Sequence, residues 1–170
     1  MILNTERMTG CGEYLVDGYQ VNFLYGLNDI CKKFLNKDKI LLELGSNSGI
    51  STQLFSEYVN TVVSVDLVLT DNMKNVLEHN KNIMFYNMSF LDFFKQNKET
   101  FDFIYIDGSH YYEDVKTDIK NCQKKLKTDG IISGHDYNSK TSGVIKAVNE
   151  IFGKNNIEIF SDSSWVYKKL

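Results

Sequence analysis

The segment from residue 40 to residue 52 constrains the fold more than any other part of the chain. It begins with an almost continuous apolar run over residues 40–44, which is typical of a strand buried on both faces of a parallel sheet. Gly45 and Gly49 follow, with small polar residues between them, and apolar residues then recur at helical spacing as far as Tyr58. This order predicts a strand, a glycine turn and a helix. Such a turn lets a ligand lie close to the backbone, where the N–H groups at the helix start would face it.

The spacing of the two glycines separates this turn from other nucleotide-binding loops. The chain has neither the G-x-G-x-x-G of nicotinamide-dependent dehydrogenases nor the G-x-x-x-x-G-K-[ST] of P-loops, which disfavours both classes. It has E-x-G-x-x-x-G, and an acid, Asp66, ends the next apolar run about twenty residues later, where it is placed to accept hydrogen bonds from a ribose diol.

This combination resembles the class I S-adenosylmethionine-dependent methyltransferases. The resemblance implies that Gly45 to Gly49 form the cofactor loop and that Asp66 binds the ribose. The resemblance also implies that Met88 and Ser89, which follow the third strand, contact the adenine, although the usual acid is missing there. The implied cofactor-binding residues are Glu43, Gly45, Ser46, Asn47, Gly49, Asp66, Leu67, Met88, Ser89 and Asp107.

Apolar patterns along the rest of the chain predict strands that alternate with helices, and hence an α/β sheet with right-handed crossovers. Further strands are expected at 83–87, 101–106 and 131–133, with a closing hairpin at 157–160 and 165–167. A helix is expected over 21–35, and another carries the stripe Val115, Ile119, Cys122 and Leu126 through Lys127. By resemblance the sheet is Rossmann-like, with seven mostly parallel strands and an antiparallel C-terminal hairpin strand.

The whole of residues 1–170 is expected to form a single methyltransferase domain, with a loop and helix in residues 1–38 covering the pocket. Acidic and basic residues number 22 and 19, for a net charge of −3, and Arg7 is the one arginine, which disfavours nucleic acid as a partner. Three widely spaced cysteines indicate neither a disulfide framework nor a zinc site. Neither a membrane-spanning run nor a signal peptide is evident, so we expect a cytoplasmic protein without a membrane partner.

Asp107, His110, His135 and Asp136 form a second group of polar residues. They follow the carboxyl ends of two strands that should be neighbours, so they are expected in the same crevice as the glycine turn. The strings Y-I-D-G-S-H-Y-Y (residues 105–112) and G-H-D-Y (residues 134–137) resemble the methyltransferase family that modifies hydroxyls of sugars and other natural products. Several enzymes similar to that family bind a divalent cation, which by resemblance would be Mg²⁺ or Mn²⁺ held by Asp107, His135 and Asp136. His135 stands where an acid is common, and imidazole suits Mn²⁺, Fe²⁺ or Zn²⁺ better than Mg²⁺.

The chemistry that this resemblance implies requires little of the protein. The methyl group of a sulfonium is strongly electrophilic, so the protein must align the acceptor with it and remove a proton. A hydroxyl acceptor needs a general base or a metal ion that lowers its pKa. His110 and His135 are the candidate bases, with Asp136 as a residue that fixes the tautomer of His135.

Other functions remain as alternatives. A chain without proline cannot carry the proline-containing motifs of amino-methylating or cytosine-C5 nucleic-acid enzymes, but other RNA methyltransferases and protein methyltransferases stay open. A non-catalytic module that binds S-adenosylmethionine is another alternative. We expect a small-molecule acceptor with a hydroxyl group and a homo-oligomer whose partner chain helps to close the pocket.

Overall fold

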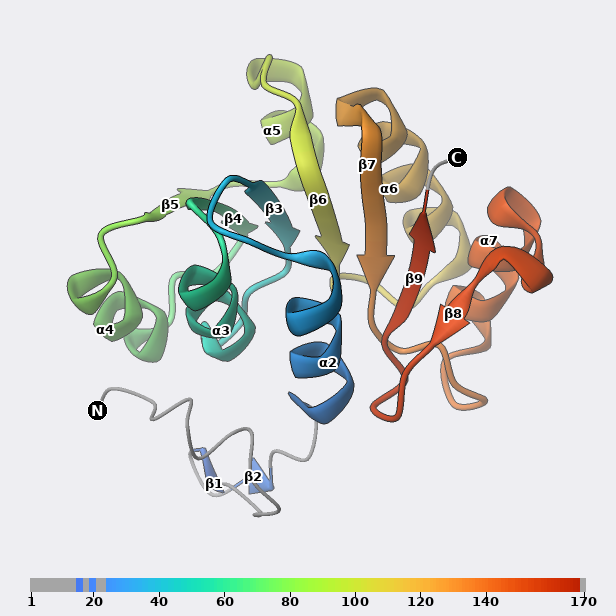
Figure 1. Cartoon of the computed structure of the whole chain (residues 1–170), viewed down its shortest axis with the longest axis horizontal. Helices are drawn as coiled ribbons and strands as arrows, with labels where there is room; N and C mark the ends of the chain where they lie inside the picture. Colours follow the sequence, from blue (N-terminus) through green and yellow to red (C-terminus); the bar gives the residue numbers. More distant parts are fainter. Residues whose placement is uncertain (1–14, 17–18, 21–23, 169–170) are drawn as a thin grey trace.

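The computed structural model describes residues 15–16, 19–20 and 24–168, and its main feature is one mixed sheet (Figure 1). The order of the strands is β5-β4-β3-β6-β7-β9-β8, in which β5 to β7 are parallel and β9 runs antiparallel to both of its neighbours. The strands are β3 (Ile40–Leu44), β4 (Thr61–Asp66), β5 (Ile83–Asn87), β6 (Phe101–Ile106), β7 (Leu126–Gly134), β8 (Glu158–Ile159) and β9 (Trp165–Lys168). The predicted fold class is therefore confirmed. A separate antiparallel pair, β1 (Leu15–Val16) and β2 (Tyr19–Gln20), precedes the sheet.

Helices bury both faces of this sheet. They are α2 (Leu24–Phe34), α3 (Ile50–Tyr58), α4 (Asp71–His79), α5 (Phe90–Gln96), α6 (Tyr112–Lys125) and α7 (Ser142–Phe152), followed by the 3₁₀ turn η1 (Lys154–Asn156). Alternate residues of β3 face opposite cores: Leu41 packs with the apolar residues of α2 and α3, and Leu42 with those of α6 and α7. This double burial explains why the strand is nearly continuous in apolar residues rather than alternating.

The predicted boundary between α6 and β7 is wrong. Helix α6 ends at Lys125, and Leu126 already has extended backbone and pairs with Phe101 of β6. Leu126 is buried, so its apolar side chain continued the helical spacing of the stripe. Residues 127–129 are exposed and polar, so the first half of the strand lacked the apolar pattern of a buried strand. The helix expected over 21–35 corresponds to α2. Residues 21–23 of that prediction, and most of the loop expected before them, lie outside the described residues.

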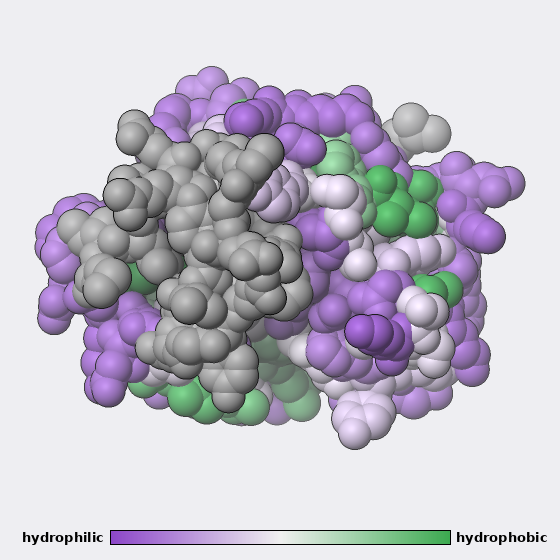
Figure 2. All heavy atoms as spheres, turned by 90° about the horizontal axis from the view of Figure 1, so that it is seen from below, coloured by the Kyte–Doolittle hydropathy of each residue, from purple (hydrophilic) through white to green (hydrophobic). Residues whose placement is uncertain are grey.

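The carboxyl ends of β3, β4, β6 and β7 meet at one edge of the sheet, where the polar residues singled out above are found (Figure 1). Figure 2 looks onto this side of the molecule, and among the described residues visible there hydrophilic side chains predominate over small hydrophobic areas. Within the described part of the chain, every helix is too short or too polar to cross a membrane.

Candidate active site

The loop between β3 and α3 has three residues with left-handed backbone: Gly45 (φ 91°), Asn47 (φ 44°) and Gly49 (φ 81°). A Cβ on Gly45 would lie 2.1 Å from the carbonyl oxygen of Asp107, and one on Gly49 would lie 2.7 Å from the sulfur of Met73. The glycines are thus required for the loop to approach the end of β6 and helix α4, in addition to allowing the left-handed conformation.

Asp66 holds this loop in place from the end of β4. Its Oδ2 accepts hydrogen bonds from the backbone N–H groups of Ser46 and Asn47, both at 2.9 Å, and its Oδ1 accepts one from Val68 at 3.0 Å. An ionised carboxylate has about four acceptor positions, so one position on Oδ1 remains for a ligand.

Glu43 lies beneath the loop and is fully buried. Its carboxyl group accepts hydrogen bonds from the hydroxyls of Ser51 and Thr52 in α3 and of Ser64 in β4. Burial raises the pKa of Glu43 to about 7, although these three hydroxyls act to lower it. Two of the predicted cofactor-binding residues therefore have other positions. Glu43 supports the loop from below, and Met88 packs against the core.

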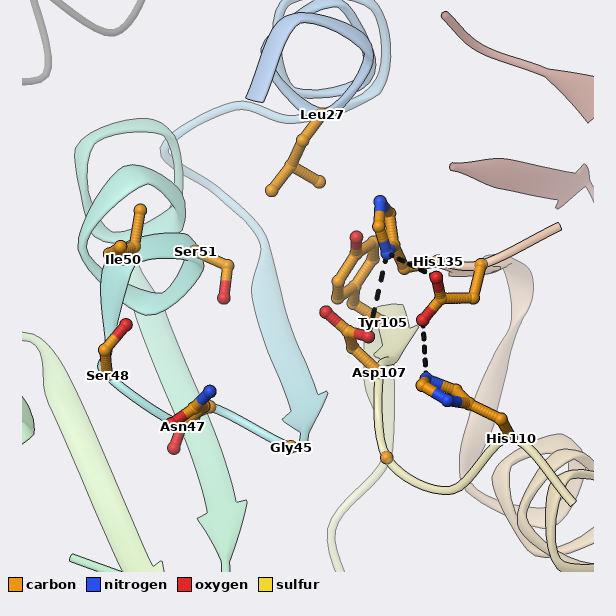
Figure 3. Close-up of a pocket in the computed structure, with 13 residues that line it drawn as sticks. Leu27, Gly45, Asn47, Ser48, Ile50, Ser51, Tyr105, Asp107, His110 and His135 are labelled. Carbon is orange, nitrogen blue, oxygen red and sulfur yellow. Dashed lines mark ion pairs between the residues drawn. The ribbon is translucent and has the colours of Figure 1, made fainter. Parts of the chain in front are cut away.

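Two cavities open at this edge of the sheet and share Gly45, Asn47, Asp107 and Gly108. The first, which we call the Asp66 cavity, has a volume of about 700 Å³ and is also lined by Asp66, Leu67, Ser89 and Phe90. The second, the histidine cavity, has a volume of about 400 Å³ and is also lined by Ser46, Tyr105, His110, His135 and Asp136 (Figure 3). The predicted loop and the predicted histidine–aspartate group thus border one continuous region.

The histidines and aspartates of the histidine cavity form a connected cluster. His110 Nε2 lies 2.6 Å from Asp136 Oδ2, and His135 Nδ1 lies 3.4 Å from Asp136 Oδ1 and 3.9 Å from Asp107 Oδ1 (Figure 3). Burial acts to lower the pKa of His135, but the hydrogen bond to Asp136 and the charges of Asp107 and Asp136 prevail and raise it to about 9. Burial raises the pKa of Asp107 to about 6, against the opposing charge of His135. Among the described residues, the imidazolium of His135 can therefore supply the positive charge between the two carboxylates.

The set of residues able to hold a metal ion differs from the predicted one. Among the described residues, the ligand atoms that lie within 4.8 Å of one another belong to Asp107, His110 and Asp136. The predicted set contained His135 in place of His110, and the two carboxylates instead flank the Nδ1 of His135. Two carboxylates and one imidazole form a donor set that suits Mn²⁺ or Fe²⁺ as well as Zn²⁺.

Several lining residues had not been singled out from the sequence. Leu27 of α2 points toward the histidine cavity, as Figure 3 shows. Phe90 of α5 and the polar residues Asp114, Thr117 and Asp118 of α6 line the Asp66 cavity. Their spacing in the sequence is that of ordinary helical surface residues, so no local signal distinguishes them.

The model of a family described as Methyltransferase domain matches residues 42–137. A Streptococcus mutans protein described as a SAM-dependent methyltransferase superimposes with a TM-score of 0.68 at 20% identity, over 92% of this chain and 51% of that one. A search among curated proteins finds no match.

Two further solved structures have the same fold. An rRNA methylase from Streptococcus thermophilus superimposes with a TM-score of 0.67 at 11% identity, over 88% of this chain and 98% of that one. A TDP-rhamnose 3′-O-methyltransferase of calicheamicin biosynthesis gives a TM-score of 0.67 at 13% identity, over 84% and 76%. The chain spans about half the length of the Streptococcus mutans protein.

Proposed function

Since the chain belongs to the Methyltransferase domain family, whose model matches residues 42–137, we propose that it is an S-adenosylmethionine-dependent methyltransferase acting on a hydroxyl of a sugar or other small metabolite. The observation that supports this best is the junction of the two cavities at Gly45 and Asp107. A ligand with an adenosine at one end and a reactive methyl at the other can extend from the Asp66 cavity into the histidine cavity.

The Asp66 cavity suits the adenosine. Asp66 retains one acceptor position for a ribose hydroxyl after its three backbone bonds. Leu67, which is 70% exposed at the cavity wall, and the ring of Phe90 offer apolar surface to a purine.

Ser46 supports the placement of the amino-acid part of the donor in the histidine cavity. The residue is only 4% exposed, it lines that cavity, and its hydroxyl has no hydrogen-bond partner among the described residues. Leaving such a group unsatisfied costs about 1–3 kcal/mol, which a carboxylate or ammonium of the ligand would offset. The residues present therefore fit the proposed donor.

The histidine–aspartate cluster would serve the acceptor. S-adenosylmethionine supplies the electrophilic methyl group, so the chain itself must orient the acceptor oxygen and take its proton. His135 can take it only after losing its own proton to solvent, because its raised pKa keeps it protonated at neutral pH. Asp136 holds both rings, through His110 Nε2 and His135 Nδ1.

A divalent metal is the alternative route to the same step. Asp107, His110 and Asp136 would hold it, and a bound divalent ion would lower the pKa of the acceptor hydroxyl. His135 would then be a neighbour of the metal site and would orient Asp136.

Ligand binding tests the first part of the proposal. We expect S-adenosylhomocysteine, the demethylated product, to raise the unfolding temperature of the chain, and Asp66→Ala to weaken its binding by about 1–3 kcal/mol in calorimetry. A 2′-deoxyribose analogue should bind more weakly than the parent compound to the wild type but equally to Asp66→Ala. Equal loss in both proteins would show that Asp66 acts through the loop alone.

Transfer of labelled methyl groups tests the acceptor. Label from S-adenosylmethionine should appear on hydroxylated sugars or related metabolites and not on RNA or protein. Label on RNA or protein alone would refute the proposed acceptor class, and binding without transfer to any acceptor would favour a non-catalytic module.

A further inference from the structure

Helix α6 contributes a polar wall to the Asp66 cavity. Asp114, Thr117 and Asp118 occupy positions three and four residues apart, so they share one face of the helix, and all three line the cavity. The sequence pattern predicts an ordinary solvated helix surface here, but in the fold these residues line the same cavity as Leu67 and Phe90.

Most carboxylates of the Asp66 cavity already have partners. Asp66 accepts three backbone N–H groups, Asp107 lies beside His135, and Asp114 accepts the hydroxyl of Ser109 at 2.7 Å. Asp118 is half-buried and makes no hydrogen bond or ion pair with any other described residue. Burial, together with the charge of Asp114, raises the pKa of Asp118 to about 7, as expected of a carboxylate that lacks a donor.

The side-chain donors of Asn87, the last residue of β5, and of Ser89 are also engaged within the protein. The side-chain amide of Asn87 donates to the carbonyl oxygens of Asp66 and Leu67. The hydroxyl of Ser89 donates to Asp92 and caps α5 by accepting the N–H of the same residue. Neither side chain is a carboxylate, so Asp118 is the carboxylate of the Asp66 cavity that has no hydrogen-bond donor among the described residues.

We infer that Asp118 accepts a hydrogen bond from the exocyclic amine of the adenine and thereby selects adenine over 6-oxopurines in the methyl donor. This inference rests on the proposed function, which places an adenosine in the Asp66 cavity. Adenine carries an amine donor at C6, whereas hypoxanthine carries a carbonyl acceptor at the same position. A carboxylate bonds to the first and repels the second.

The test compares two ligands on three proteins at pH 8, where Asp118 is mostly ionised. The ligands are S-adenosylhomocysteine and S-inosylhomocysteine, and the proteins are the wild type, Asp118→Asn and the control Glu113→Gln, which removes an exposed acid of α6 that does not line the cavity. We expect the wild type and the control to prefer the adenine ligand by about tenfold to a hundredfold, the range that one hydrogen bond to a charged group gives. Asp118→Asn should lose most of this preference, because its amide group can also donate to a 6-oxo group.

Each outcome bears on a separate claim. An unchanged preference in Asp118→Asn, with the fold verified by thermal unfolding, would overturn the role of Asp118 while leaving the proposed function intact. If Asp118→Asn unfolds, Asp118→Ala serves in its place and should bind both ligands with similar, weaker affinity; a retained preference would overturn the inference. Failure of the wild type to bind S-adenosylhomocysteine would overturn the proposed function and this inference with it.

Discussion

His135 is held between two carboxylates, and this contact decides its charge. With a pKa of about 9, His135 is protonated at neutral pH. To act as a general base or as a metal ligand, as the sequence predicted, it must first lose this proton. The same raised pKa makes its ion pairs stabilise the fold fully below about pH 6.5, and this contribution is lost as the pH rises through about 9.

If His135 is the general base, its neutral fraction limits the reaction. Below its pKa that fraction rises about tenfold per pH unit, so we expect kcat/KM for methyl transfer to rise from pH 6 and to level off near pH 9. His135→Gln should abolish this dependence in initial-rate measurements. His79→Gln is the matched control, because His79 is exposed at the end of α4, far from the cluster in sequence.

A flat pH profile would contradict the role of His135 as base. If activity is then also lost on treatment with EDTA and restored by Mn²⁺ or Mg²⁺, removal of the proton depends on a metal held by Asp107, His110 and Asp136. Activity that survives chelation but is lost in His135→Gln would favour the base.

At the level of elements, Glu43 joins three segments that must keep a fixed relation for the loop to form. From β3 it binds Ser51 and Thr52 at the start of α3 and Ser64 in β4. The glutamate of the E-x-G-x-x-x-G pattern is thus a buried residue that links these three segments through hydrogen bonds. Its carboxyl group takes up a proton readily, because full burial penalises the charged form.

The raised pKa of Glu43 predicts how stability depends on pH. The pKa of about 7 in the folded state exceeds the ordinary glutamate value of 4.5, so the stabilising effect of protonation is complete below about pH 4.5 and is lost as the pH rises through 7. We expect Glu43→Gln, which keeps a hydrogen-bonding side chain of similar shape but cannot ionise, to reduce the fall in unfolding free energy between pH 5 and pH 8 by about 2.5 kcal/mol. Urea unfolding at both pH values measures this, and parallel pH profiles for the two proteins would show that Glu43 titrates normally.

At the level of the whole molecule, α2 contacts the loop between β8 and β9, and Leu27 of α2 also lines the histidine cavity. Asp162, in the loop between β8 and β9, accepts the backbone N–H of Leu27 in the first turn of α2 at 2.7 Å and that of Ser164 at 2.9 Å. A Cβ on Gly26 would lie 2.0 Å from the same carboxylate, so the helix and the loop are in close contact. Asp162 therefore positions α2 and, through it, Leu27 at the cavity.

We expect Asp162→Ala to lower the unfolding free energy by about 1–2 kcal/mol, the effect of losing a helix cap. Amide exchange in α2 should quicken more than exchange in β3 or β6, because α2 loses its attachment to the hairpin. The exposed acid Asp129 provides the control, and Asp129→Ala should leave both measurements nearly unchanged. Uniform acceleration over the whole sheet in Asp162→Ala would contradict a local role.

The sequence by itself determined the order and type of the main elements and the nature of the glycine loop. These follow from patterns within short windows: apolar runs for doubly buried strands, helical spacing for the helices, and glycines where the backbone must be left-handed. The position of Asp66 at a strand end was likewise readable, because parallel strands end at one edge of the sheet. For the same reason Asp107, His110, His135 and Asp136 could be expected together.

Only the tertiary structure decided which of these side chains meet and in which direction they point. It directed Glu43 away from both cavities, brought His110 rather than His135 into the group that can hold a metal, and placed Asp118 and Leu27 in the cavity walls. It also placed Leu126 in β7 rather than in the expected helix, because Leu126 pairs with Phe101 of β6. These outcomes depend on strand register, side-chain direction and burial among residues far apart in the chain. Because local sequence patterns do not encode such distances, the charge of His135 and the pairing of each carboxylate emerge only once the elements pack together.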